Sequence, residues 1–148
     1  MSTPVDTGQI LLLGASRLNR LQIEVLAQLK EPLTVRQYRI LLRIDEGVTS
    51  LSDLSKLAHR SLPTTSESVD GLIRRKLLTR GPSEIDRRAV VLQLTRSGRR
   101  ALADAHEKFE GLAAAILSAV PEREQKAFAK FSALIYTYAG KELWGEEA

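Results

Sequence analysis

Cysteine does not occur in this chain of 148 residues, which excludes disulfides, thiolate metal sites and cysteine-based redox switches. Such a composition fits a reducing compartment. Aromatic residues make up only 5% of the chain, so its core must consist mainly of Leu, Ile, Val and Ala. Long apolar runs are also missing, since the run Ile10–Leu13 is too short for a signal-peptide core or a membrane span. We therefore expect a cytoplasmic protein with no membrane partner.

Sequence signatures of catalysis are equally scarce. The chain has two histidines, His59 and His106, which lie in different predicted elements and have no metal-ligand partner at helical spacing. We find no glycine-rich phosphate loop, no nucleophile elbow and no carboxylate pair in an obvious cleft. The sequence therefore predicts no catalytic, metal-binding or cofactor-binding residue, and we do not expect an enzyme.

Positive charge is concentrated in the middle of the chain. The net charge of +4 is modest, but residues 56–100 contain eleven Lys or Arg and four Asp or Glu, a net +7 that leaves −3 for the remainder. A basic segment of this kind is typical of a surface that binds a polyanion. A charged face in contact only with solvent would have the same composition, so charge alone does not decide between the two.

Two helices are predicted in the first third of the chain. Apolar residues recur at helical spacing from about residue 8 to 29 and cover more than one side, which indicates burial on several sides. Pro32 ends this helix. Thr34 and Gln37 form a capping-box pair at the start of the next one, which ends before Gly47, where a left-handed cap is favoured.

The next two helices form a helix-turn-helix pattern. Ser50 caps a short helix over residues 51–58, and after a tight connection Ser61 caps a helix that runs to about Lys76. The residues expected to face the core are Leu51, Leu54, Leu57, Ala58, Leu62, Thr65, Val69, Leu72, Ile73 and Leu77.

A β-hairpin with a basic tip follows. Residues 78–80 are predicted to form a short strand and residues 89–94 a second one, with a charged, turn-rich segment between them. Thr95 then caps a long helix to about residue 120, and a last helix extends to about Trp144. This order of elements predicts a mainly α fold with a small β-hairpin wing.

The outer side of the second helix of the helix-turn-helix suits the major groove of DNA. Small side chains let the backbone approach base edges, hydroxyls can bond to bases or phosphates, and two arginines near its end can reach phosphates. Glu67 can accept a hydrogen bond from cytosine or pair with one of these arginines. The candidate DNA-contacting residues on this helix are Ser61, Pro63, Thr64, Thr65, Ser66, Glu67, Ser68, Arg74 and Arg75.

The hairpin tip supplies a second group of candidates, namely Asp86, Arg87 and Arg88. The minor groove is narrow and negative over A·T-rich DNA and attracts arginine. Asp86 can orient one arginine through a charge-assisted hydrogen bond. A solvated loop is the alternative, and the position of the tip directly after a helix-turn-helix favours contact with DNA.

Five groups of residues also share their order and spacing with a known family. They are Leu33-Thr34-x-x-Gln37, Leu54, Leu72 to Arg80, Asp86-Arg87-Arg88-Ala89 and Leu94-Thr95-x-x-Gly98. In these landmarks the chain resembles the MarR family of winged helix-turn-helix transcription regulators over about residues 8–144. Asp86 and Arg88 correspond to the aspartate and the wing-tip arginine of that family.

The resemblance implies a single domain over residues 1–148. Its winged helix part would span about 33–95, with dimerisation helices at about 8–30 and 96–144, and residues 62–76 would be the recognition helix. Binding would be to a palindrome in double-stranded DNA at or near a promoter, often weakened by a small organic ligand. The resemblance places a ligand pocket near the junction of the first, second and long fifth predicted helices. Tyr38, Arg17 and Arg39 are candidate polar contacts there, although packing and solvent exposure explain these three residues equally well.

Two positions depart from the family pattern. His59 lies in the turn before the recognition helix and Lys76 directly after that helix, where the family usually has glycine. Both positions are expected to need a left-handed backbone, which costs a non-glycine residue roughly 1 kcal/mol or more. These two departures from the family pattern put the local turn geometry and the orientation of the recognition helix in question, but they do not affect the predicted fold.

The apolar surface of the terminal helices predicts a homodimer. An isologous two-fold interface would bury it and would place two recognition helices about 34–36 Å apart, one turn of DNA. Packing of the two terminal helices on each other within one chain is the alternative. The residues concerned are Leu11, Leu12, Leu18, Val25, Phe128, Phe131, Leu134, Ile135, Tyr138, Leu143 and Trp144.

The sequence therefore predicts a sequence-specific DNA-binding regulator, a repressor that binds a palindromic promoter site as a homodimer and is released by a small organic ligand. Two alternatives remain. A winged helix that docks on other proteins would carry a hydrophobic outer stripe and no basic wing tip. A ligand-binding protein without DNA binding stays open because two turn glycines are missing.

Overall fold

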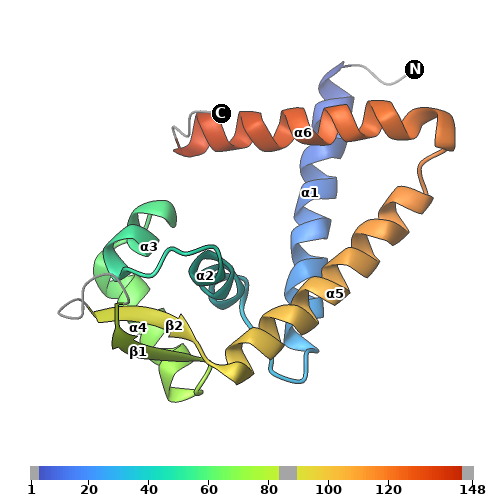
Figure 1. Ribbon diagram of the computed structural model, residues 1–148. Helices are drawn as coiled ribbons and strands as arrows, with labels where there is room; N and C mark the ends of the chain where they lie inside the picture. Colours follow the sequence, from blue (N-terminus) through green and yellow to red (C-terminus); the bar gives the residue numbers. More distant parts are fainter. Residues whose placement is uncertain (1–3, 84–89, 145–148) are drawn as a thin grey trace. The chain divides into compact units, whose positions relative to one another are not determined.

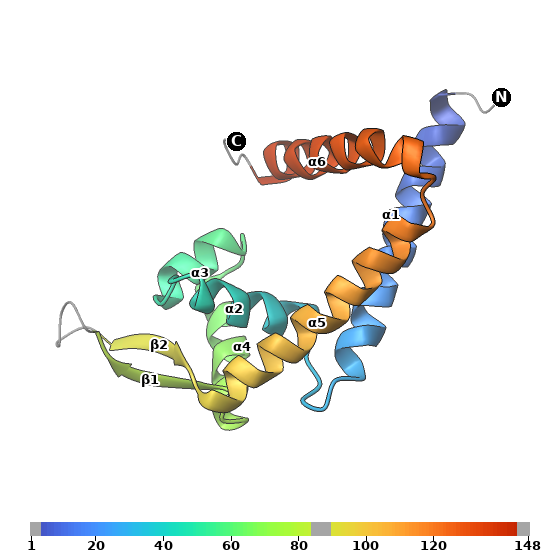
Figure 2. The same cartoon turned by 45° about the vertical axis from the view of Figure 1, so that its right-hand side comes forward.

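The computed structural model describes residues 4–83 and 90–144, with side chains over residues 6–83 and 90–139. Six helices and one two-stranded antiparallel sheet make up these residues, so the prediction of a mainly α fold with a small β-hairpin is confirmed (Figures 1 and 2). The elements are α1 (Pro4–Ala27), α2 (Val35–Asp45), α3 (Leu51–Leu57), α4 (Leu62–Arg74), β1 (Leu78–Pro82), β2 (Val90–Leu94), α5 (Arg96–Ser118) and α6 (Glu122–Trp144).

The chain divides into two compact units, residues 1–109 and residues 110–148. In the first unit α4 contacts α2, α3 and β1, while α2 also contacts α1 and β2. Its core is built almost entirely from leucine, isoleucine, valine and alanine, as the shortage of aromatic residues requires. The largest fully buried side chains are those of Leu26, Leu41, Val69, Leu72, Leu77 and Leu78.

The hairpin is fixed to the helices at two places. β1 follows α4 after only three residues, and β1 and β2 pair in register from Leu78 with Leu94 to Pro82 with Val90. The amide of Leu92 donates to the carbonyl of Thr49 in the α2–α3 loop at 2.9 Å. The hairpin is therefore attached to the helix-turn-helix through both of its strands.

The predicted helix starts at Thr34, Ser50 and Ser61 are confirmed. Thr34 and Gln37 form a complete capping box, in which the Thr34 amide donates to Gln37 Oε1 at 3.0 Å and the Gln37 amide donates to Thr34 Oγ1 at 3.1 Å. Ser50 caps α3 by accepting from the Asp53 amide at 3.0 Å. These local bonds satisfy first-turn amides that have no helical partner.

Three successive helices, α2, α3 and α4, end in the same Schellman-type turn. In each, one residue with positive φ donates its amide three positions back, and the next amide donates five positions back, at 2.8–3.1 Å. That residue is Gly47 in α2 (φ 97°), His59 in α3 (φ 47°) and Lys76 in α4 (φ 59°). The expectation that His59 and Lys76 need a left-handed backbone is therefore confirmed.

Two of the leucines expected in the core are exposed. Leu57 is 43% exposed and Leu62 is 50% exposed, whereas Leu54 and Leu72 are buried as predicted. The two exposed leucines flank the α3–α4 turn, where the helices change direction and no longer share one inner side. The helical spacing of apolar residues could not predict the exposure of these two leucines, because such spacing identifies the inner side only within a single helix.

Several large apolar side chains of the terminal helices are exposed in the single chain. No helix of the described residues is long and apolar enough to cross a membrane. Leu143 and Trp144 lie outside the residues whose side chains are described. The exposed residues are Ile10, Leu12, Leu13, Leu18, Leu21 and Ile23 on α1, and Phe128, Phe131, Leu134, Tyr136 and Tyr138 on α6.

Candidate nucleic-acid interface

The N-terminal end of α4 presents small polar residues at the surface. The Ser61 hydroxyl caps the helix, accepting from the Thr64 amide at 3.4 Å and sharing a 2.8 Å hydrogen bond with the Thr64 hydroxyl. Pro63 occupies the first turn, where its missing amide hydrogen costs nothing. Ser61 and Pro63 are exposed and Thr64 is half-buried, so this end of α4 is accessible to a partner molecule.

The hydroxyls farther along α4 bond within the helix. Ser68 donates to the Thr64 carbonyl at 3.1 Å, and Ser66 donates to Asp70 Oδ2 at 3.4 Å. Both serines are half-buried. Because a hydroxyl that donates can still accept, their oxygens can receive bonds from the amino group of a base.

Thr65 does not belong with the surface candidates. Its side chain is 3% exposed, and its hydroxyl donates to the Ser61 carbonyl at 3.1 Å. Its place in the predicted inner stripe of the helix is correct, and its place among the predicted DNA-contacting residues is corrected by this burial. A side chain of α4 that faces the core cannot also contact DNA, so the two predictions for Thr65 excluded each other.

Glu67 and Arg74 are both exposed on α4. The expected ion pair of Glu67 with Arg74 or Arg75 is not formed among the residues that the structure describes. The Glu67 carboxylate is therefore open to solvent. In the major groove it could accept a hydrogen bond from cytosine N4.

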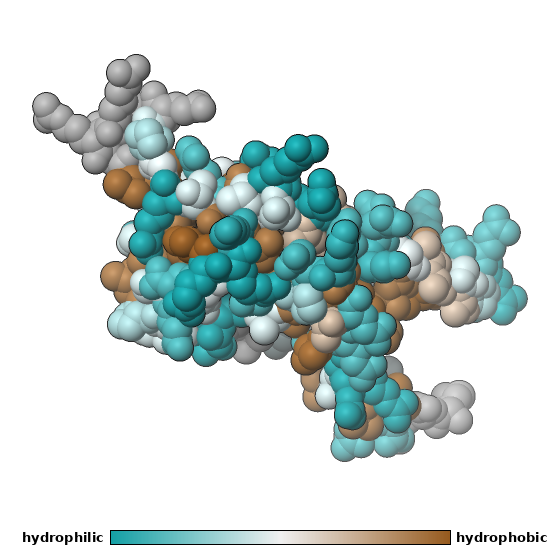
Figure 3. Space-filling view, turned by 90° about the horizontal axis from the view of Figure 1, so that it is seen from below, coloured by the Kyte–Doolittle hydropathy of each residue, from teal (hydrophilic) through white to brown (hydrophobic). Residues whose placement is uncertain are grey.

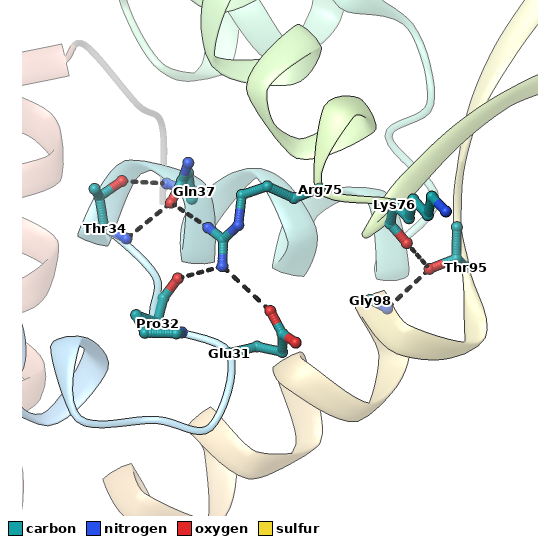
Figure 4. A network of polar contacts seen from close by, with 8 residues as sticks. All are labelled: Glu31, Pro32, Thr34, Gln37, Arg75, Lys76, Thr95 and Gly98. Atoms are coloured by element: carbon teal, nitrogen blue, oxygen red, sulfur yellow. Dashed lines mark hydrogen bonds and ion pairs between the residues drawn. The ribbon is translucent and has the colours of Figure 1, made fainter.

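Arg75 turns away from the side of α4 on which the sequence placed it. Its guanidinium donates to the Pro32 carbonyl at 2.7 Å and to Gln37 Oε1 at 3.3 Å, and it lies 3.5 Å from Glu31 Oε2 (Figure 4). All three partners belong to the α1–α2 loop and the start of α2. The structure thus gives the expected phosphate-binding arginine a set of partners inside the protein.

Asp70 and Arg80 connect α4 to the hairpin. Arg80 Nη2 lies 2.8 Å from Asp70 Oδ1, and both side chains are about half-exposed. The sequence did not reveal this pair, because the two residues are ten positions apart and in different elements. This ion pair also removes one uncompensated negative charge from α4.

The three wing candidates, Asp86, Arg87 and Arg88, lie outside the described residues. β1 ends at Pro82 and β2 begins at Val90. These two residues pair with each other at the end of the hairpin that is farthest from α4 along the strands. The roles assigned to the wing tip remain predictions.

Basic side chains are exposed around the helix-turn-helix and at the start of α5. Seen from below the view of Figure 1, hydrophilic residues cover most of the molecular face, with apolar patches between them (Figure 3). Such a surface suits contact with a charged and hydrated partner. The exposed basic residues of this part of the chain are Lys56, Arg60, Arg74, Lys76, Arg80, Arg96, Arg99 and Arg100.

The candidate ligand residues have different surroundings. Arg17 and Arg39 are exposed. Tyr38 is half-buried on α2, and its ring packs edge-to-face on Phe109 and His106 of α5, with centroids 5.1 and 5.9 Å apart. Burial raises the pKa of Tyr38 above its ordinary value, and the charge of Glu46 raises it further. The Tyr38 hydroxyl is therefore even harder to deprotonate than an ordinary tyrosine, and it remains a donor and acceptor of hydrogen bonds.

Hollows on the surface lie elsewhere. One cavity of about 440 Å³ is lined by residues of the α2–α3 loop and α3, from Gly47 to Leu57. Another of about 470 Å³ is lined by residues 119–131 in the second unit. Neither is lined by Tyr38. The described residues also contain no group of three or more His, Asp or Glu that could hold a metal ion.

Comparison with known proteins supports the fold at the level of the whole chain. RV1404 from Mycobacterium tuberculosis is 27% identical, with 95% of this chain and 97% of that protein covered at a TM-score of 0.75. A MarR family protein from Bacillus stearothermophilus is 22% identical, with coverage of 93% and 95% and a TM-score of 0.79. FabT from Streptococcus pneumoniae, solved in complex with DNA, is 22% identical, with coverage of 91% and 96% and a TM-score of 0.78.

No curated protein matches the sequence of this chain. The model of the MarR family matches residues 31–89, which contain the helix-turn-helix and β1 but not β2. The chain is therefore similar to proteins of the MarR family in its winged helix-turn-helix fold and, over residues 31–89, in its sequence.

Proposed function

We propose that the chain is a sequence-specific DNA-binding transcription regulator that inserts α4 into the major groove. The observation that carries this proposal is the exposed side of α4, where small polar residues from Ser61 to Ser68 are followed by the exposed Arg74. Small residues allow a helix to approach base edges, and an arginine at the end of the helix can reach a phosphate. FabT, which has the same fold, was solved in complex with DNA.

The proposal assigns the wing tip to the minor groove. Arg88, oriented by Asp86, would enter the groove, and Arg87 would add positive charge beside it. The attachment of both described strands to the helix-turn-helix supports this role, since Leu92 of β2 bonds to Thr49 and Arg80 of β1 pairs with Asp70 of α4. A contact in each of two grooves would define the register of the protein on DNA.

We further propose that the regulator binds a palindromic promoter site as a homodimer, with dimerisation helices over about residues 8–30 and 96–144. Exposed apolar side chains such as Leu12 (72%) and Leu134 (64%) support this, because water contact with so much apolar surface is unfavourable. Dimers of helix-turn-helix proteins read two half-sites one helical turn apart.

Repression and release by a small organic ligand complete the proposal. A protein bound over a promoter blocks transcription, and the half-buried Tyr38, whose ring packs on Phe109 and His106, lies where the family resemblance expects the ligand. Access to promoter DNA requires that the protein act in the cytoplasm.

Selection of binders from a random pool of duplex DNA tests the function directly. The pool would be offered to the wild-type chain and, as a control, to an Arg88→Ala variant at near-physiological salt. We expect enrichment of a palindrome with half-sites about ten base pairs apart by the wild type. Binding without an enriched sequence, lost steeply as salt rises, would reduce the basic surface to a non-specific polyanion site and overturn the proposal.

A further inference from the structure

We propose that Arg75 is a positioning residue, which aims α4 by anchoring its C-terminal end to the α1–α2 loop. It would not contact DNA itself. This inference rests on the proposed DNA-binding function, and it gives Arg75 a role opposite to the phosphate contact that the sequence indicates.

The contacts of Arg75 have the geometry of an anchor. Nη2 donates to the Pro32 carbonyl at 2.7 Å and lies 3.5 Å from Glu31 Oε2, while Nη1 donates to Gln37 Oε1 at 3.3 Å (Figure 4). A planar guanidinium with several donors can reach partners on separate residues at once. The Arg75 side chain is only 33% exposed, so these bonds are partly shielded from water.

Gln37 is itself a fixed point. The same Oε1 atom accepts from the Thr34 amide in the capping box, at 3.0 Å. Arg75 therefore bonds to an atom whose position is already set by the start of α2. Movement of α4 relative to α2 would have to break the Arg75 contact or the cap of the neighbouring helix.

A second anchor holds the residues directly after Arg75. The Thr95 hydroxyl donates to the Lys76 carbonyl at 2.7 Å and accepts from the Gly98 amide at 2.9 Å, at the start of α5 (Figure 4). The Thr95 amide donates to the Leu77 carbonyl at 3.1 Å. The end of α4 is thus held in two directions. Thr95 connects the carbonyls of the residues after α4 to the start of α5, and Arg75 connects α4 to the α1–α2 loop.

The neighbouring Arg74 shows what a DNA-contacting arginine at this end would look like. It is exposed, and it forms no ion pair within the described part of the chain. Adjacent residues of a helix point in directions about 100° apart. Arg74 is therefore available to contact DNA, whereas Arg75 is bonded to the α1–α2 loop and the start of α2, and Arg74 is the matched control.

The test measures DNA affinity and its dependence on salt for the variants Arg75→Ala, Arg75→Lys and Arg74→Ala. The probe is the duplex that the wild type enriches from the random pool, or a random-sequence duplex of equal length if none is enriched. Lysine keeps the charge and binds phosphate well, but it cannot reproduce the guanidinium fork. Thermal unfolding of each variant verifies that it folds.

We expect Arg75→Ala and Arg75→Lys both to weaken binding about tenfold, the effect of losing a charged hydrogen bond, while the slope of log K against log salt stays that of the wild type. Arg74→Ala should instead flatten this slope by about one unit. If Arg75→Lys binds like the wild type and Arg75→Ala flattens the slope, Arg75 is a phosphate contact and the proposal is overturned. Unchanged affinity in both Arg75 variants overturns it too.

Hydrogen exchange separates failure of this proposal from failure of the function. Loss of the anchor should speed exchange of the Lys76 and Leu77 amides, which bond to the last turn of α4, in both Arg75 variants. If the wild type binds no DNA, the proposed function fails and with it the aiming role. In that case hydrogen exchange tests only whether Arg75 anchors α4. Faster exchange of the Lys76 and Leu77 amides in the Arg75 variants supports the anchor, and unchanged exchange overturns it.

Discussion

His59 and Lys76 hold the backbone in a region that glycine occupies at lower cost. Left-handed backbone costs an L-residue about 1–2 kcal/mol, while glycine gains about 0.4–1 kcal/mol of unfolded-state entropy that opposes folding. We therefore expect Lys76→Gly and His59→Gly each to raise the free energy of unfolding by about 0.5–1 kcal/mol. Urea unfolding followed by circular dichroism would measure this.

Gly47 provides the control within the same molecule, because α2 ends in the same turn with glycine in place (φ 97°). We expect Gly47→Ala to lower the free energy of unfolding by about 1 kcal/mol. The added Cβ has space, so this loss would come from the strained backbone alone. A stability gain in Gly47→Ala, or none in the two glycine variants, would show that this turn stores no strain.

Arg88 carries the sharpest functional prediction at the scale of one residue. By analogy with a good base-edge contact, Arg88→Ala should weaken specific binding by about 1–3 kcal/mol, because the minor groove would lose its inserted cation. Fluorescence anisotropy with the selected duplex at moderate salt would measure the affinity. Equal affinities of variant and wild type would refute the wing-tip role.

At the scale of elements, Gly98 allows α5 to start against the end of α4. A Cβ at this position would overlap the carbonyl oxygen of Leu77, a backbone atom that also accepts from the Thr95 amide. Because neither partner can move without breaking the junction, Gly98→Ala should lower the free energy of unfolding by about 1–3 kcal/mol. Urea unfolding provides the measurement.

The matched control for Gly98 is Gly111, in the same helix. A Cβ there meets nothing within 4 Å, so Gly111→Ala should raise stability by about 0.4–1 kcal/mol through lower unfolded-state entropy. Similar effects of the two substitutions would mean that helix propensity, and not the α4–α5 junction, determines the response at Gly98.

The same elements show how far local sequence patterns reach. Caps at Thr34, Ser50 and Ser61 and the left-handed turn at Gly47 depend on a few neighbouring residues and were predictable from them. The left-handed turns at His59 and Lys76 were predicted only by comparison with the family pattern. Exposure of Leu57 and Leu62 was not, because it depends on how two helices meet across a turn.

At the scale of the whole molecule, the terminal helices predict the oligomeric state. Sedimentation of the free protein should give about twice the chain mass of 16.4 kDa, since a two-fold interface is the commonest way to cover exposed apolar helices. Leu134, 64% exposed on α6, is the residue to change. Leu134→Glu should shift the protein toward the monomer, because a carboxylate in an apolar interface is costly.

Lys126→Glu is the control on the same helix, since it also places a carboxylate at an exposed position of α6. It should leave the sedimentation of the dimer unchanged. A wild type that sediments as a monomer at micromolar concentration would refute the proposed dimer, whatever the variants do.

The sequence alone determined the order of elements, their caps and turns, and the place of the candidate DNA-reading helix, because each of these depends on short-range bonds and on the spacing of apolar residues. Tertiary structure decided where the side chains of that helix go. Only the packing of α2, α4 and the α1–α2 loop could direct Arg75 inward while Arg74 stays exposed, pair Asp70 with Arg80, and bury Thr65. These contacts join residues 10 to 44 positions apart, or depend on which side of a helix meets the core, and no local pattern encodes either.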